Sequence, residues 1–554
     1  KYCGAIDLKD LIIAREHDDL DSLISYSYPY LADHEGISES IEKIKDYAED
    51  SLPVLNDSKE IVGIITAQDV VEAVDDEMGE DYAKLAGLTA EEDLRETTKE
   101  SMKKRLPWLV ILLFLGMAVS TVVGAFEGVV AVLPIVICFQ SLILDMAGNV
   151  AFMFLCTIMV LGMTPGLGMF YGGMVRRKNA LNTMMFCFAM MGIGMLLWVA
   201  VGYSLCFGED HGGIIGDLHY AFLQNVPWTS DSDEVPPMML ALFNMMFAVI
   251  SPAIILGSLA ERMKFSKMML LCIIWTLVVY YPLAHMTWGG GFLDDPIGSI
   301  DFAGGNVIHI STGVSGLVAC MILGRRKGFG AMSYHPHNIP LFLIGAAVLW
   351  VGWLGFNCGC AGGANEIAIL ALANTTISSA ASMVVWMLME TIIQKKCTVM
   401  GAVTGGIVGL VGITPGAGYV PIWSAFLIGA IAAPICFFAI SKAKQKFGYD
   451  DALDAFGCHG VGGIWGGIAT GLFANSSVNA AVPHNGLVFG EWRLFVAQLA
   501  ASAISIAIAA TFTAVIMLIL KKCGGVRVSD MEEAQGLDQI EHGERAYPAF
   551  NGLD

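Results

Sequence analysis

The chain has 554 residues, of which 55% are hydrophobic and 15% charged, with a net charge of −21 and a mean hydropathy of +0.63. Soluble domains are about half apolar and a quarter charged, so this balance indicates a membrane protein and excludes a single globular enzyme. A nucleic-acid binder, which needs a basic surface, is excluded too. Residues 1–105 hold 27 acids and 12 bases, a balance of −15, so an acidic soluble head precedes a nearly neutral body.

Residues 1–100 are predicted to form an acidic α/β head. An apolar strand from Leu52, a polar turn at 56–59, a second β-branched strand and a helix beginning at Thr66 follow one another. Residues 1–14 repeat the second half of this unit, so we expect two copies, the first of them cut off. The aligned pairs are Gly4 with Gly63 and Asp10 with Asp69.

This pattern resembles CBS domains, which bind adenine nucleotides or sense ions. The resemblance implies that Thr66 and Asp69 hold a ribose, and the favoured alternative is that Thr66 is only a helix N-cap. Five carboxylates lie within residues 75–81. Clustered carboxylates suit Mg²⁺, which prefers oxygen ligands, and a solvated acidic face is the alternative. The candidate ligands are Glu77, Glu80 and Asp81.

Residues 101–150 are predicted to be a truncated membrane segment. A basic cluster at 103–105 leads into the apolar run 106–126, and a second run follows at 129–144. An acidic CBS pair joined to such runs resembles the end of the cytosolic region and the first membrane helix of MgtE-type magnesium channels, without most of their pore. The basic clusters before and after these runs are both expected on the cytoplasmic side, so the chain between them must cross the membrane an even number of times. One of the runs between them therefore does not cross. We therefore expect 129–144 to be re-entrant, interfacial or misplaced, with a join between unrelated pieces near Val150.

The region 151–525 shows eleven apolar segments that are long enough, or nearly long enough, to span a membrane. The expected fold class is therefore an all-α polytopic membrane protein with an N-terminal α/β head. The eighth segment is short and rich in glycine. The predicted limits are 151–171, 180–207, 238–260, 268–288, 303–323, 340–362, 366–393, 398–412, 422–441, 455–474 and 495–520.

Lysine and arginine cluster in the loops after the odd-numbered segments. By the positive-inside rule these loops are cytoplasmic, which places the start of the first segment outside and the tail, 526–554, inside. Of 19 bases beyond residue 105, only Arg493 falls on the other side. We therefore expect a multi-pass protein of the plasma membrane, with both the head and the tail in the cytoplasm.

Glycine-rich motifs recur in the body and the tail, in order and without a large gap. They are Thr164–Gly173, Ala284–Gly291, Asp301–His309, Gly352–Ala361, Asp450–Gly460 and Gly536–Tyr547. From about residue 151 to 550 the chain resembles the Amt family of ammonium transporters. The resemblance implies an eleven-helix bundle, ammonium as the substrate, no required cofactor, a homotrimer, and a tail that presents a surface to PII-type signalling proteins.

Two histidines lie inside apolar segments, where ionisable groups are costly and usually functional. His309 and His459 each follow an acidic residue, Asp301 or Asp454, and satisfied core histidines are the alternative. The resemblance implies that they are twin pore histidines sharing a hydrogen bond, which together offer one donor and one acceptor. It also implies that Asp301 braces the vestibule through backbone hydrogen bonds. We expect Asp451 and Asp454 to be gating or structural.

A recruitment site for a cation is predicted at the outer end of the fourth segment. Trp288 offers a π face to NH₄⁺, with a membrane-interface aromatic as the alternative. The resemblance implies that Trp288, Phe247 and Cys360 recruit the ion and that Phe247 and Phe356 form a stacked gate. Cys360 stands where the family usually has Ser. Because a thiol is larger and a weaker acceptor, we expect a shallower site that depends more on Trp288 and on backbone carbonyls.

The leading hypothesis is a transporter that recruits NH₄⁺ outside and conducts NH₃, with or without separate proton transfer. A bare cation would pay a large desolvation cost in an apolar pore. The alternative is magnesium transport, or a Mg²⁺-sensing module formed by the head, which is also the expected place for Mg²⁺ or an adenine nucleotide. No nucleophile–base pair, phosphate loop or metal-ligand spacing points to an enzyme.

Overall fold

The computed structural model describes residues 2–6, 21, 24–25, 30–34, 51–66, 134–230, 234–331 and 334–547. The chain divides into two compact units, Lys1–Ile137 and Cys138–Asp554, which we describe separately.

The first unit contains a small three-stranded sheet. Strand β1 (Leu31–Ala32) pairs in parallel with β2 (Ser51–Leu55), which pairs antiparallel with β3 (Ile61–Thr66). Buried Leu31 and Leu52 hold its core. The predicted strand, turn and strand are confirmed. In the turn, the side chain of Asn56 accepts hydrogen bonds from the backbone, as is typical of an Asx turn.

The predicted sites of the head fall mostly outside the described residues. Thr66 is the last residue of β3, paired with Ser51. The helix expected after it, and the predicted ribose or Mg²⁺ ligands, lie outside the part of the chain that the structure describes. These ligands are Asp69, Glu77, Glu80 and Asp81.

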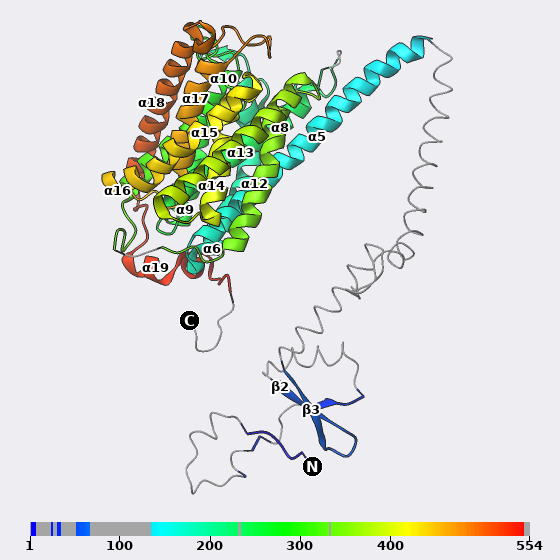
Figure 1. Ribbon diagram of the computed structural model, residues 1–554, viewed down its shortest axis with the longest axis vertical. Coiled ribbons are helices and arrows are strands. Elements are labelled where there is room, and N and C mark those ends of the chain that lie inside the picture. The colour runs from blue at the N-terminus through cyan, green and yellow to red at the C-terminus, as the bar shows by residue number, and fades with distance from the viewer. Residues whose placement is uncertain are drawn as a thin grey trace. The chain divides into compact units, whose positions relative to one another are not determined.

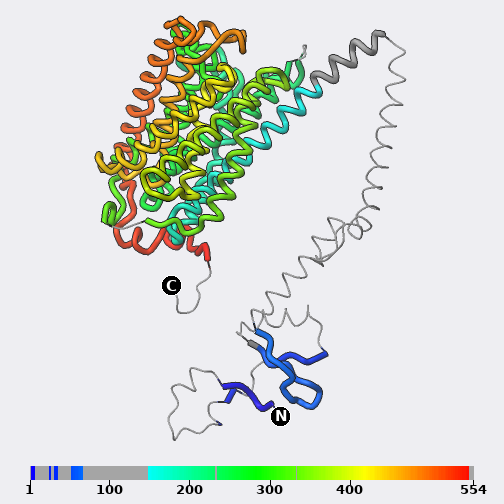
Figure 2. The backbone as a smooth tube through the Cα atoms, viewed as in Figure 1, coloured from blue at the N-terminus to red at the C-terminus, as the bar shows by residue number. Residues whose placement is uncertain are grey.

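The second unit is a bundle of long helices that run roughly along one axis (Figures 1 and 2). Where a span is interrupted, a π-helical turn continues it. In chain order the helical elements are α5 (Pro134–Met174), α6 (Ala180–Leu197), η3 (Trp198–Gly202), α7 (Tyr203–Phe207), α8 (Pro237–Leu259), α9 (Phe265–Trp275), η5 (Thr276–Tyr280), α10 (Tyr281–Trp288), η6 (Gly305–Ile310), α11 (Ser311–Leu323), α12 (Ile339–Gly359), α13 (Glu366–Gln394), α14 (Val399–Ile413), α15 (Ile422–Phe438), η8 (Ala439–Ala443), α16 (Lys444–Phe447), η9 (Phe456–Gly460), α17 (Val461–Phe473), α18 (Arg493–Lys522), α19 (Asp530–Gln535) and α20 (Leu537–His542).

Each of the eleven predicted segments of the body corresponds to a helical span. Ten helices of the described chain are long and apolar enough to cross a membrane. The span at 456–473, made of η9 and α17, is not among those ten, although it is buried in the bundle. Its glycines and His459 lower its mean hydropathy.

Helix α5 runs across the predicted join near Val150. It continues from Pro134 to Met174 without a break, 41 residues or about 60 Å, of which Ala147–Met174 forms the apolar span. The described part of the run at 129–144 therefore belongs to the same helix as the first span. No residue in this stretch breaks the helix, and Pro165, inside the span, is accommodated within it.

Short elements close the bundle at both ends. A small hairpin of β4 (Asp210–His211) and β5 (Ile215–Gly216) follows α7, near α10. The tail helices α19 and α20 lie at the opposite end (Figure 1), where α20 contacts α6. We call these the α10 end and the tail end.

Candidate functional site

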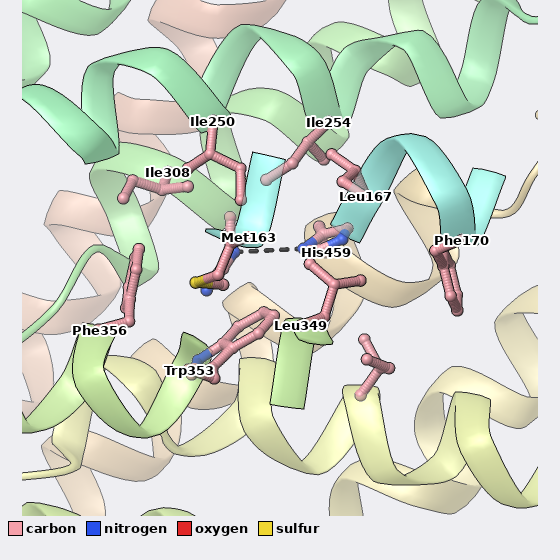
Figure 3. A pocket seen from close by; sticks show the side chains of 12 residues that line it. Met163, Leu167, Phe170, Ile250, Ile254, Ile308, Leu349, Trp353, Phe356 and His459 are labelled. Carbon is pink, nitrogen blue, oxygen red and sulfur yellow. Dashed lines mark hydrogen bonds between the residues drawn. The ribbon is translucent and has the colours of Figure 1, made fainter. Parts of the chain in front are cut away.

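Two buried histidines meet in the middle of the bundle. The Nδ1 atoms of His309 and His459 are 3.2 Å apart, and the ring centroids are 5.2 Å apart (Figure 3, dashed line). Since two Nδ1 atoms share one proton, one ring donates and the other accepts. Their Nε2 atoms therefore have opposite roles, one accepting and the other donating. The Nε2 atom of His309 is buried and has no partner among the described residues, so it is left for a guest molecule.

Each histidine lies in a π-helical turn, η6 or η9, and a carboxylate holds the start of that turn. Oδ1 of Asp301 accepts hydrogen bonds from the N–H groups of Gly304 and Gly305, and Oδ2 accepts those of Asn306 and Val307. A helix start leaves N–H groups unpaired, and a buried carboxylate satisfies them. This arrangement fixes η6 and with it the ring of His309.

Asp451, and not Asp454, performs this task for His459. Its Oδ1 accepts from the N–H of Ala455 and from the hydroxyl of Ser258, and its Oδ2 accepts from the N–H of Phe456. Asp454 is paired instead with Lys444, at 2.7 Å. Asp301 and Asp451 both precede their histidine by eight residues, so the spacing identifies the true counterpart.

Glycines let the two segments approach each other. A Cβ on Gly313 would lie 2.1 Å from the backbone nitrogen of Gly460, and a Cβ on Gly463 would lie 2.9 Å from the Cβ of His309. Each glycine follows its own histidine by four residues and packs against the segment that carries the other. Small residues at such crossings bring helix backbones together, and here they bring the two rings within hydrogen-bonding distance.

The cavity at the histidines is narrow and apolar. Its volume is about 20 Å³, enough for a single water-sized molecule. Trp353 stacks against the ring of His309, with the planes at 23° and the centroids 5.3 Å apart. The lining, shown in Figure 3, consists of Met163, Leu167, Phe170, Ile250, Ile254, Ile308, His309, Leu349, Trp353, Phe356, Ile407 and His459.

A wider cavity opens toward the α10 end, and we call it the Trp288 vestibule. Its volume is about 270 Å³, and its lining consists of Phe207, Leu240, Phe243, Asn244, Phe247, Trp288, Phe302, Gly359, Cys360, Ala361 and Gly362. The indole N–H of Trp288 donates to the carbonyl of Asp301 at 2.8 Å, which fixes the ring beside the cavity. The thiol of Cys360 donates to the carbonyl of Phe356 at 3.3 Å.

Two phenyl rings separate the Trp288 vestibule from the histidines. Phe247 and Phe356 have ring centroids 4.3 Å apart, and both are buried. Phe247 lines the vestibule, and Phe356 lines the histidine cavity. Phe243 extends the aromatic group, with its centroid 4.8 Å from that of Phe247.

A third cavity, of about 30 Å³, leads from His459 toward the tail end, and we call it the Asp454 mouth. Phe170, Tyr171, Asp454 and His459 are among its lining residues. Together the three cavities form a series through the bundle, with the histidines at its narrowest described point.

Charged groups fasten the loops at the tail end. Arg326 donates to Glu261 and to Asp450, each at 2.8 Å. Burial raises the pKa of Glu261, but Arg326 and Arg176 lower it by more, so its net pKa lies below the ordinary 4.5. For Asp450, burial is likewise outweighed by the hydrogen bond from Arg326 and the charge of Arg262, and its pKa is lowered. Both carboxylates are thus charged at neutral pH.

The tail is bound to this end of the bundle. Asp538 accepts hydrogen bonds from the N–H groups of Leu181 and Asn182, at the start of α6. Burial raises the pKa of Asp538, and these N–H groups oppose the rise. Glu533 pairs with Arg527 and accepts from the N–H of Lys327. The tail therefore caps a membrane helix and contacts a loop.

Sequence reasoning named the histidines, Trp288 and the phenyl pair. The structure places the two histidines in contact, and it places Phe247 beside both Phe356 and Trp288. Sequence reasoning missed Trp353 and Asn244, whose place depends on which helix faces meet. A bulky aromatic between the glycines of the sixth segment was the available signal for Trp353. Among the described residues, no group of three or more His, Cys, Asp or Glu side chains is placed to hold a metal ion.

Comparison with known proteins identifies both parts of the chain. Residues 151–547 match the Ammonium Transporter Family, and residues 20–76 match the CBS domain. An ammonium transporter of Bacillus subtilis (strain 168) is 46% identical over 402 residues, which cover 72% of this chain and 98% of that protein.

Solved structures share the fold of the body. Mep2 of Saccharomyces cerevisiae has a TM-score of 0.65 at 33% identity, covering 70% of this chain and 88% of its own. A protein described as a sensor Amt protein has a TM-score of 0.67 at 25% identity, covering 72% and 99%. The chain, with its CBS domain, is a multi-pass membrane protein that belongs to the Ammonium Transporter Family.

Proposed function

We propose that the body recruits NH₄⁺ in the Trp288 vestibule and passes NH₃ along the two histidines to the Asp454 mouth. The observation that carries this proposal is the hydrogen-bonded pair of His309 and His459 in a cavity of about 20 Å³ with an otherwise apolar lining. An ion stripped of water there would lose several kcal/mol of hydration, whereas neutral NH₃ loses far less.

In this mechanism the vestibule and the pore act on different species. The π face of Trp288 attracts the cation while it is still partly hydrated, because a volume of about 270 Å³ leaves room for water. At the stacked rings of Phe247 and Phe356 the ion gives up a proton to water in the vestibule. The NH₃ that passes then accepts a hydrogen bond from one histidine and donates one to the other. The proton follows separately or stays behind.

The same proposal covers orientation and assembly. The positive loops support a tail end in the cytoplasm and an α10 end outside, in the plasma membrane. The tail, held by Asp538 and Glu533 against the loops, is then a cytoplasmic surface for a PII-type signalling protein, and the body assembles as a homotrimer. Family resemblance supports these two assignments. The CBS match supports Mg²⁺ or an adenine nucleotide as a ligand of the head, which modulates transport.

The test is uptake by the full chain in proteoliposomes. We expect uptake of radiolabelled methylammonium that unlabelled ammonium competes away, and no uptake of Mg²⁺ measured with an internal Mg²⁺ dye. Mg²⁺ uptake without methylammonium uptake would establish the magnesium alternative instead. Adding Mg²⁺ or an adenine nucleotide on the tail side tests the head, because an unchanged transport rate with both would remove its modulating role.

A further inference from the structure

One polar side chain of the Trp288 vestibule has no role in the mechanism so far. Asn244 lies on α8, three residues before Phe247, so the two share a face of the helix. Its neighbours Leu240 and Phe243 line the same cavity. This amide lies among aromatic and aliphatic groups, in the cavity where we propose that the cation binds.

The orientation of this amide follows from its one hydrogen bond. The Nδ2 atom of Asn244 donates to the carbonyl of Leu240 at 2.9 Å. A carbonyl only accepts, so the NH₂ group must face it and the opposite assignment of the amide is excluded. The Oδ1 atom remains as an acceptor on a side chain that lines the cavity, and no described residue donates to it.

The other polar side chains of the vestibule are already engaged. The indole N–H of Trp288 donates to the carbonyl of Asp301, and an indole has no acceptor atom in its plane. The thiol hydrogen of Cys360 points to the carbonyl of Phe356, and its sulfur is a weak acceptor. Among the residues that line this cavity, Asn244 is the only one whose side chain carries an oxygen. A hydrated ammonium ion needs acceptors as it sheds water.

We propose that Asn244 is a substrate-binding residue of the vestibule, whose Oδ1 accepts a hydrogen bond from ammonium opposite the π face of Trp288. This inference rests on the proposed function and extends it to a residue that partly replaces the weak acceptor at Cys360. The carbonyl dipole of an amide favours a cation with N–H donors, so this oxygen sets the affinity for ammonium more than the rate of passage through the histidine cavity.

The test compares Asn244→Leu with Asn244→Gln in the proteoliposome assay. Leucine keeps the branching and the number of heavy atoms but removes the acceptor, so we expect KM for methylammonium to rise at least about tenfold, as for the loss of one hydrogen bond to a charged group. The maximal rate should stay within twofold. Glutamine keeps the oxygen one methylene further out and should recover most of the affinity. Thr376→Val, which removes a hydroxyl bonded to Leu372 on the exposed face of α13, is the control.

Two outcomes would overturn the inference. One is a KM for Asn244→Leu within twofold of the unmodified chain, and the other is a KM for Asn244→Gln as high as that for Asn244→Leu. Loss of the maximal rate with an unchanged KM would also contradict it, since that pattern indicates a structural role. If the unmodified chain shows no ammonium-sensitive uptake at all, the proposed function itself fails, which is a distinct result.

Discussion

The two histidine segments are built alike but enter the bundle from opposite ends. In each, an aspartate holds the start of a π-helical turn, a histidine follows eight residues later, and a glycine four residues beyond presses against the other segment. The segment of His309 begins at the Trp288 vestibule, and that of His459 begins beside Lys444 at the tail end. This arrangement is typical of inverted repeats, whose shared site lies where the copies meet.

The differences between the segments lie at their outer ends. Asp301 accepts four backbone N–H groups, whereas Asp451 accepts two and the hydroxyl of Ser258. The vestibule at one end has about 270 Å³ and an aromatic lining, while the Asp454 mouth has about 30 Å³ and a charged pair. The arrangement that positions the histidine rings thus occurs twice, and the two openings differ.

The largest effect is expected at the pair of histidines, where the two segments meet. Replacing both His309 and His459 with Ala removes the donor and the acceptor for passing NH₃, about 1 kcal/mol each in a dry cavity. Ammonium-specific uptake should fall roughly 30- to 100-fold or more. Uptake of methylammonium, with potassium flux measured in parallel, checks this. His484→Ala, a change at a partly exposed histidine paired with Glu491, is the control. Uptake at the unmodified rate in the double variant would refute the pore role.

The glycine contacts test whether the two crossings are equally tight. Gly313→Ala places a methyl group 2.1 Å from the backbone of Gly460, which has no means to yield, and should cost about 3 kcal/mol or more. Gly463→Ala meets the Cβ of His309 at 2.9 Å and should cost about 1–2 kcal/mol. Thermal unfolding in detergent compares the two, with Gly192→Ala in α6 as the control, because nothing lies within 4 Å of a Cβ at that position. A more damaging Gly463→Ala would reverse the comparison.

The two aspartates differ in the number of groups they satisfy. In Asp301→Asn an NH₂ group must face two backbone N–H groups, at about 1–3 kcal/mol for each unpaired donor. In Asp451→Asn the NH₂ group faces only the N–H of Phe456, if the other oxygen stays toward Ser258. We expect the fall in unfolding temperature to be roughly twice as large for Asp301→Asn. Equal shifts would mean that the extra hydrogen bonds of Asp301 contribute little.

The sequence predicted the spans and the path, because apolar length and glycine-rich motifs are local properties. It named Asp454 as the acidic residue before His459 and expected both Asp451 and Asp454 to be gating or structural. Only the fold decides which carboxylate faces the N–H groups. Trp353 and Asn244 were beyond a local pattern, because each matters only through residues on other helices. The span of His459 lies within the apolar segment predicted at 455–474, although it is not among the ten described helices that are long and apolar enough to cross a membrane.

The smallest expected effect concerns the Trp288 vestibule. In Cys360→Ser a hydroxyl, which is a better acceptor than a thiol, faces the Trp288 vestibule. We expect KM for methylammonium to fall about threefold to tenfold, with little change in the maximal rate, because the histidine cavity is untouched. Cys358→Ser, a change at a buried neighbour outside the vestibule lining, is the matched control. An unchanged KM in Cys360→Ser would mean that the thiol does not weaken recruitment, and that Trp288 with Asn244 already supplies what the serine would add.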